Sequence, residues 1–139
     1  MLGYRFKDRS WLKVAIYGRA TQDFQHQVAS WGGSILSTVY LVHNFPSFER
    51  GLDEAYKNVS SDAQLAKVVE RSGLVDLLGD TISDHPVDHY ARILKALVGA
   101  VFIDSGKNLD FAQRVIETLW NRGNKLGVNI LEQKHATVV

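Results

Sequence analysis

The chain contains no cysteine, two prolines and one methionine among its 139 residues. Without cysteine it can form neither disulfide bonds nor zinc sites built on thiolates, which is compatible with an intracellular protein. No apolar run is long enough to cross a bilayer, and no basic segment followed by an apolar one resembles a secretory leader. We therefore expect an intracellular protein without a membrane partner, in a compartment that the sequence does not specify.

The chain also has little net charge. Its 16 Lys and Arg residues nearly balance 15 Asp and Glu residues, so the formal net charge is +1. A charge this small does not by itself indicate a polyanionic partner, and any affinity for nucleic acid must come from a local cluster of basic residues. With 45% hydrophobic residues, a chain of this length can form one globular domain with its own core.

Apolar residues recur at helical spacing along most of the chain, and capping residues separate the segments. The predicted helices are one capped by Asp8 or Ser10, one over 28–45 ended by Pro46, one over 61–69 stopped by Gly73, one over 87–103 closed by Gly106, and one capped by Asn108 and ended by Gly123. The fourth is apolar nearly all round, which predicts a buried central helix. We expect an all-α domain over 1–123 and a tail, 124–139, that is either disordered or bound to a partner.

Two stretches of the chain stand out as specific motifs. They are Leu2-Gly-Tyr-Arg-Phe-Lys-Asp8 near the start and Lys95-Ala-Leu-Val-Gly-Ala-Val-Phe-Ile-Asp-Ser-Gly106 in the predicted central helix. Both are similar to conserved segments of the ribonuclease III domain family, and shorter matches lie between them. The resemblance covers about residues 1 to 120 and implies the ribonuclease III-like endonuclease-domain helical fold.

The family's members are nucleases that use Mg²⁺ to cut double-stranded RNA. They carry two carboxylates four residues apart on one helix and two more three residues apart on another, spacings that place each pair on one helix face. Such carboxylates hold the Mg²⁺ that activates water and neutralises charge on the phosphate. In this chain the four positions are Ala29, Gly33, Arg92 and Lys95. We therefore expect no catalytic residues and no metal at these positions, because two cations repel the ion and no oxygen ligands remain.

Arg92 and Lys95 have two interpretations. They contact RNA phosphates directly, where the family uses metal ions, or they are solvated or paired with acids such as Glu49, Asp53 and Glu54. A charged pair on an apolar helix must face water, a cleft or a counter-ion, which fits both. Further basic residues of the first segment would extend an RNA-facing surface: Arg5, Lys13 and Arg19.

Family members dimerise through the helix that holds the first acid pair, so the resemblance implies a homodimer. The apolar residues of this helix predict the seam: Val28, Trp31, Ile35 and Val39. The alternative places Trp31 in the core of the monomer. Gly32 and Gly33 each cost about 1 kcal/mol in a helix relative to alanine. They indicate either close packing of another backbone or a site without its usual side chains.

Other catalytic signatures are lacking. The five histidines, including His85 and His89, form no His-Glu-x-x-His pattern, and we expect structural roles for them. Ser30, Ser34 and Ser37 lie outside any Gly-x-Ser-x-Gly elbow, so acyl transfer is not supported.

The sequence favours a double-stranded-RNA-binding or RNA-associated structural protein, in an RNA-processing or ribonucleoprotein assembly, with no cofactor. One alternative is a divergent Mg²⁺-dependent nuclease that uses Asp84 and Asp88, although these acids are more simply explained by a helix pair of Asp88 with Arg92 and a helix cap at Asp84. Another is a protein-interaction module, the silent half of a dimer. The sequence leans against an enzyme without deciding the question.

The separate RNA-binding domain of many family members has no counterpart in these residues, so RNA affinity should fall steeply with salt.

Overall fold

The computed structural model describes residues 2–16, 22–44, 60–77 and 86–123. Its elements are α1 (Arg9–Ile16), α2 (Gln22–Asn44), α4 (Asp62–Arg71), the short 3₁₀ helix η2 (Leu74–Leu77), α5 (Pro86–Asp104) and α6 (Leu109–Gly123). No strand occurs in these ranges. The all-α prediction is confirmed, whereas the predicted tail, 124–139, lies outside the described residues.

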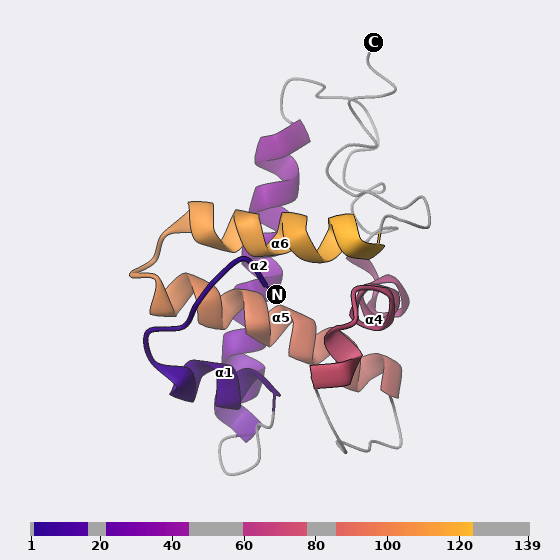
Figure 1. Ribbon diagram of the computed structural model, residues 1–139, viewed down its shortest axis with the longest axis horizontal. Coiled ribbons are helices and arrows are strands. Elements are labelled where there is room, and N and C mark those ends of the chain that lie inside the picture. The colour runs from indigo at the N-terminus through magenta and orange to yellow at the C-terminus, as the bar shows by residue number, and fades with distance from the viewer. Residues whose placement is uncertain (1, 17–21, 45–59, 78–85, 124–139) are drawn as a thin grey trace.

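Helix α5 lies at the centre of the fold. It contacts α1, α2, α4 and α6; the long α2 crosses it, and α6 turns back beside it after a short connection (Figure 1). Its apolar side chains between Ala91 and Val101 are at most 1% exposed. Burying one large aliphatic side chain contributes about 1.5–3 kcal/mol, so the helix predicted as the central element anchors the core.

Local capping sets most helix boundaries. The Asp8 carboxylate accepts a hydrogen bond from the Ser10 N–H at 2.9 Å, so Asp8 caps α1 and Ser10 lies inside it. The Ser61 hydroxyl accepts from the Gln64 N–H at 3.4 Å at the start of α4. After α4 ends, Gly73 adopts a positive φ of 83°, as expected for a helix stop.

Helix α2 begins earlier than the sequence predicted. Its first turns, 22–27, lie before the predicted start at residue 28. Gln25 in this segment is only 4% exposed, and its side-chain amide donates to the Ala15 carbonyl oxygen at 2.8 Å. This bond satisfies a carbonyl at the end of α1. It joins two helices, so a local pattern could not reveal it.

The N-terminal segment is fastened to the far end of α5 by Asp104. Its carboxylate accepts hydrogen bonds from the Tyr4 hydroxyl at 2.6 Å and from the N–H groups of Lys7 and Asp8 at 2.8 and 2.9 Å. Burial by itself raises the pKa of Asp104, but these hydrogen bonds outweigh it and the pKa is lowered. The two motif stretches noted in the sequence therefore meet at Asp104.

The α2–α5 crossing depends on two glycines. A Cβ atom at Gly32 would overlap the backbone carbonyl of Lys95, and one at Gly99 would overlap the carbonyl of Val28. The two helix backbones are therefore in direct contact. The close packing of another backbone that was predicted at Gly32 occurs within the chain.

The predicted dimer seam is wrong for three of its four residues. Val28, Ile35 and Val39 are 0%, 8% and 1% exposed and belong to the core of the chain itself, because the face of α2 that carries them packs inside the fold. Trp31 is 37% exposed, so it does not lie in the monomer core as the alternative supposed. Of the four predicted seam residues, only Trp31 remains available to a partner.

Candidate functional site

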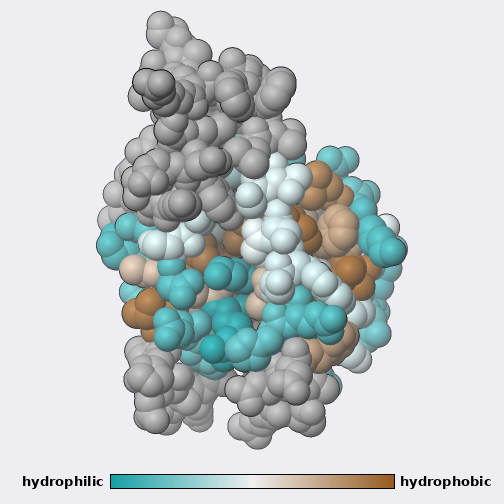
Figure 2. All heavy atoms as spheres, turned by 180° about the vertical axis from the view of Figure 1, so that it is seen from behind, coloured by the Kyte–Doolittle hydropathy of each residue, from teal (hydrophilic) through white to brown (hydrophobic). Residues whose placement is uncertain are grey.

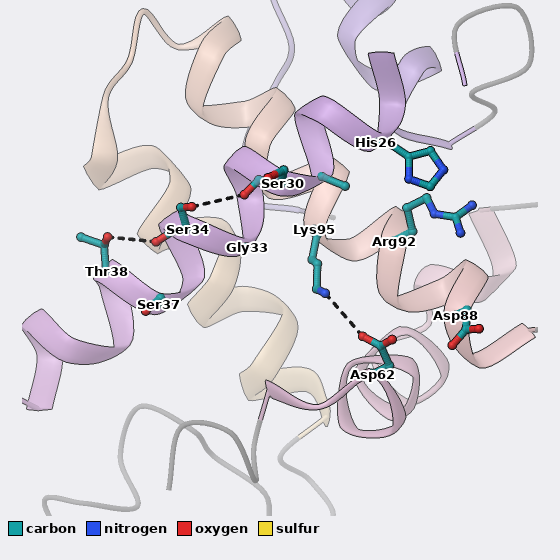
Figure 3. A pocket seen from close by; sticks show the side chains of 11 residues that line it. His26, Ser30, Gly33, Ser34, Ser37, Thr38, Asp62, Asp88, Arg92 and Lys95 are labelled. Atoms are coloured by element: carbon teal, nitrogen blue, oxygen red, sulfur yellow. Dashed lines mark hydrogen bonds and ion pairs between the residues drawn. The ribbon is translucent and has the colours of Figure 1, made fainter. Parts of the chain in front are cut away.

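A polar pocket of about 890 Å³ lies between α2 and α5, with the first residue of α4 at its edge (Figure 3). Residues at helical spacing form its α2 wall: His26, Ala29, Ser30, Gly33, Ser34, Ser37 and Thr38. Asp88, Arg92 and Lys95 of α5 and Asp62 of α4 complete it. Its volume is within the range typical of ligand pockets. Seen from the α2 side, hydrophilic side chains gather over the middle and lower part of the described surface (Figure 2).

All four positions that the resemblance assigns to metal-binding carboxylates line this pocket. Ala29 and Gly33 are one turn apart on α2, and Arg92 and Lys95 one turn apart on α5. Sequence spacing predicted that each pair shares a helix face. The contact at Gly32 brings the two faces together, and this the sequence did not show.

Gly33 differs from its neighbour Gly32. A Cβ atom at Gly33 would meet only the Lys95 Cδ, at 3.8 Å, which is ordinary van der Waals contact. The position therefore has room for a side chain directed into the pocket. Both interpretations of the glycine pair apply, one to each residue: Gly32 packs against a backbone, and Gly33 leaves space in the site.

Lys95 is ion-paired with Asp62. Its Nζ lies 3.4 Å from the Asp62 Oδ1, and the two side chains are 33% and 50% exposed. The acids considered from the sequence, Glu49, Asp53 and Glu54, lie outside the described residues. Asp62 was expected only as part of the helix predicted over 61–69. Its place beside Lys95 is a tertiary contact across 33 positions, which no local pattern marks.

Arg92 extends toward His26 at the other end of the pocket (Figure 3). Over the ranges that the structure describes, no carboxylate is ion-paired with its guanidinium. The predicted helix pair between Asp88 and Arg92 is therefore wrong. Both side chains line the pocket, but they point apart (Figure 3). Arg92 presents its fork of N–H donors to the pocket.

The pocket is closer to electrical balance than the sequence indicated. Replacing four carboxylates by two cations predicted a positive site, but Asp62 and Asp88 bring two negative charges to the same lining. Among the described residues, no group of three or more His, Cys, Asp or Glu side chains is arranged to hold a metal ion. Asp84, considered as a relocated ligand, lies outside these residues.

His89 lies on α5 three residues before Arg92. Its Nε2 is buried and has no hydrogen-bond partner among the described residues. Burial first, and then the charge of Arg92, lower its pKa below the usual 6.5, so the imidazole is neutral at pH 7. Its ring packs near Tyr90, with centroids 6.1 Å apart.

The other predicted RNA contacts do not join this pocket. Arg5 lines a smaller cavity of about 250 Å³ with Tyr4 and Ser105. That cavity is at the C-terminal end of α5, about 18 Å along the helix from Arg92. Lys13 is exposed on α1 and is not part of the lining, and Arg19 lies outside the described residues. Neither of the two described residues of this set therefore lies in the lining beside Arg92 and Lys95.

A second surface feature is an aromatic cluster on α1 and α2, of which only Trp31 was singled out from the sequence, as a seam residue. The Trp11 and Phe24 rings lie 5.7 Å apart, and the Phe24 and Trp31 rings 6.4 Å apart. Phe24 is 36% exposed and Trp31 is 37% exposed. Exposed aromatic side chains of this kind are enriched at protein interfaces.

The fold and the pocket define an all-helical protein with a polar, charge-balanced site at a helix crossing. Comparisons with protein-family models, with curated protein sequences and with solved structures give no significant match. Within the described ranges, no helix combines the length and apolar character needed to cross a membrane.

Proposed function

We propose that this chain is a ribonuclease III-like domain without the family's metal chemistry, and that it binds double-stranded or structured RNA. The supporting observation is that four positions from two helices come together in one pocket. Ala29 and Gly33 on α2 and Arg92 and Lys95 on α5 line one pocket, as the resemblance requires of four positions that hold metal in active members. In this chain two of the four are cations suited to phosphate.

The two cations would bind RNA in different ways. A guanidinium can donate two parallel hydrogen bonds to one phosphate, whereas an ammonium acts as a point charge. Arg92 has no described carboxylate partner and is available, while Lys95 is engaged by Asp62. Because Asp62 and Asp88 offset the positive charge, this site would bind RNA weakly. Weak binding suits an RNA-associated structural protein held by other contacts in an intracellular ribonucleoprotein or RNA-processing assembly.

Titrating the protein with long double-stranded RNA at several salt concentrations tests this proposal. Replacing both pocket cations (Arg92→Glu with Lys95→Glu) should weaken binding at least tenfold and flatten the dependence on salt by about one to two counter-ions. The control changes the same charge outside the pocket, at the exposed Lys67 and Arg71 of α4 (both to Glu). Equal losses in the two variants, or no binding even at low salt, would overturn the proposal.

The nuclease alternative is tested in the same preparation. Incubation with Mg²⁺ should leave the RNA intact, as in a control without divalent ions, because the described pocket lining lacks a converging set of carboxylates. Mg²⁺-dependent cutting that persists across preparations and is abolished by Asp88→Asn would instead establish a divergent enzyme.

One observation favours the protein-interaction alternative, the exposed pair Phe24 and Trp31. A homodimer formed through this aromatic surface remains part of the proposal, with Trp31 as its one retained seam residue. Sedimentation of the protein and of Trp31→Ser measures this. If the unchanged protein associates but does not bind RNA, and Trp31→Ser abolishes the association, the chain would be an interaction module rather than an RNA-binding protein.

A further inference from the structure

The Lys95–Asp62 ion pair lies at the mouth of the proposed RNA site. The Lys95 side chain passes beside Gly33, whose missing side chain leaves the ammonium free to reach α4 across the open pocket (Figure 3). Its Nζ is 3.4 Å from the Asp62 carboxylate. Asp62 is the first residue of α4, and the preceding cap by Ser61 fixes where that helix begins. The position of the carboxylate therefore follows from the fold.

The two pocket cations thus differ in state. Arg92 has no carboxylate partner among the described residues, whereas Lys95 has one. A carboxylate and a phosphate present the same kind of anionic oxygen to an ammonium. Both cannot sit close to one Lys95 without repelling each other. Since the Lys95 and Asp62 side chains are 33% and 50% exposed, their pairing is weak and solvent can replace it.

We propose that Asp62 is an internal competitor for Lys95, which RNA phosphate must displace before this half of the pocket can bind. This inference rests on the proposed function, because it concerns the regulation of the same site. Asp62 lowers the affinity of the pocket without closing it. Anything that moved the start of α4 away from α5 would release Lys95 and strengthen RNA binding.

The test is an RNA-binding titration of Asp62→Asn, which keeps the shape of the side chain and removes its charge. Because an exposed ion pair is a modest competitor, affinity for double-stranded RNA should rise about two- to fivefold. The slope of log affinity against log salt should steepen by up to about one, because Lys95 no longer divides its charge between Asp62 and phosphate. The matched control is Glu70→Gln, an exposed acid on the same helix outside the pocket lining, which should give a smaller gain and no change in slope.

A double variant decides whether the effect passes through Lys95. In a Lys95→Gln background, Asp62→Asn should give no gain beyond that of Glu70→Gln. Asp62→Ser replaces Asp62→Asn if thermal unfolding shows that the latter does not fold. If the unchanged protein binds RNA and neither Asp62 variant binds it more tightly, Asp62 is not a competitor for Lys95. The RNA function would then still stand. The competitor is also overturned if Asp62→Asn raises RNA affinity no more than Glu70→Gln does. The same holds if the gain from Asp62→Asn persists in the Lys95→Gln background. No binding by any form at low salt overturns both.

Discussion

Gly32 on α2 lies against the backbone carbonyl of Lys95 on α5, with no space for a side chain between them. Gly99 makes the reciprocal approach to the carbonyl of Val28. This crossing places the polar faces of the two helices side by side and so forms the pocket. Gly33, one residue further along α2, is rotated out of the crossing and faces the pocket instead.

The two adjacent glycines should respond oppositely to alanine. Gly32→Ala should lower the free energy of unfolding by about 3 kcal/mol, since the new methyl group forces two packed backbones apart. Gly33→Ala should be neutral or stabilising by up to about 1 kcal/mol, because alanine is the better helix former and the space is open. Urea denaturation of both variants measures this. Equal destabilisation would contradict the helix crossing described here.

Placing carboxylates at the four pocket positions should create a metal site. The variant Ala29→Glu, Gly33→Asp, Arg92→Asp and Lys95→Glu places four acids around one pocket, where hard divalent cations prefer oxygen ligands. Calorimetry with Mn²⁺ should show binding by this variant and none by the unchanged protein at the same concentration. A version with only the two α5 substitutions should bind more weakly. If the folded fourfold variant binds no metal, the resemblance to the nuclease family loses its geometric support.

Asp104 should stabilise the fold only above acidic pH. Its pKa in the folded protein lies below the ordinary value of 3.8 because of hydrogen bonds from Tyr4, Lys7 and Asp8. Its contribution is therefore complete above that value and is lost as pH falls through the folded pKa. Asp104→Asn should cost about 1–2 kcal/mol at neutral pH, allowing for its exposure to solvent. Unfolding curves from neutral to acidic pH should show the difference from the unchanged protein shrinking.

The partner of Asp104 gives the complementary test at high pH. Burial, the hydrogen bond to Asp104 and its negative charge raise the pKa of Tyr4 to about 12 from 10.0. The phenol therefore adds stability that is complete below pH 10.0 and lost as pH rises toward 12. Tyr4→Phe should remove this alkaline loss. If absorbance titration finds an ordinary phenol in the folded protein, the Tyr4–Asp104 contact is absent in solution.

His89 should make the fold less stable in mild acid. Burial and Arg92 lower its pKa in the folded state, so the unfolded chain takes up the proton first as pH falls below 6.5. Stability from the neutral imidazole is therefore present above 6.5 and declines as pH falls toward the folded value. His89→Leu should flatten this decline between about pH 8 and pH 5. An unchanged slope of melting temperature against pH would show that His89 is not the group responsible.

Most helix ends were predictable because capping is a local interaction. The Ser61 hydroxyl bonds the N–H three residues on, and the Asn108 side chain bonds the N–H of Asp110 at 3.0 Å. The start of α2 was missed because it depends on Gln25 meeting Ala15 of the preceding helix. The dimer seam failed for a related reason. Helical spacing shows that residues share an apolar face, but not whether that face packs inside the chain or against a partner.

The candidate site was predictable in part. Spacing placed Arg92 and Lys95 on one face of α5 and marked the glycines of α2 as unusual. The charge of the site could not be read in the same way, because Asp62 reaches Lys95 from a helix far along the chain. Asp88 could be placed near Arg92 by spacing, but spacing does not determine whether two flexible side chains meet.

The sequence by itself determined the all-α class, the apolar central helix and the residues that stand at the four pocket positions, since helical periodicity and residue identity are local properties of the chain. Only the tertiary structure decided that α2 and α5 touch at Gly32, that Lys95 is paired with Asp62 while Arg92 has no described carboxylate partner, and that the pocket is nearly balanced in charge. The physical reason is that electrostatic energy depends on distance in space, and distance between remote residues is set by packing.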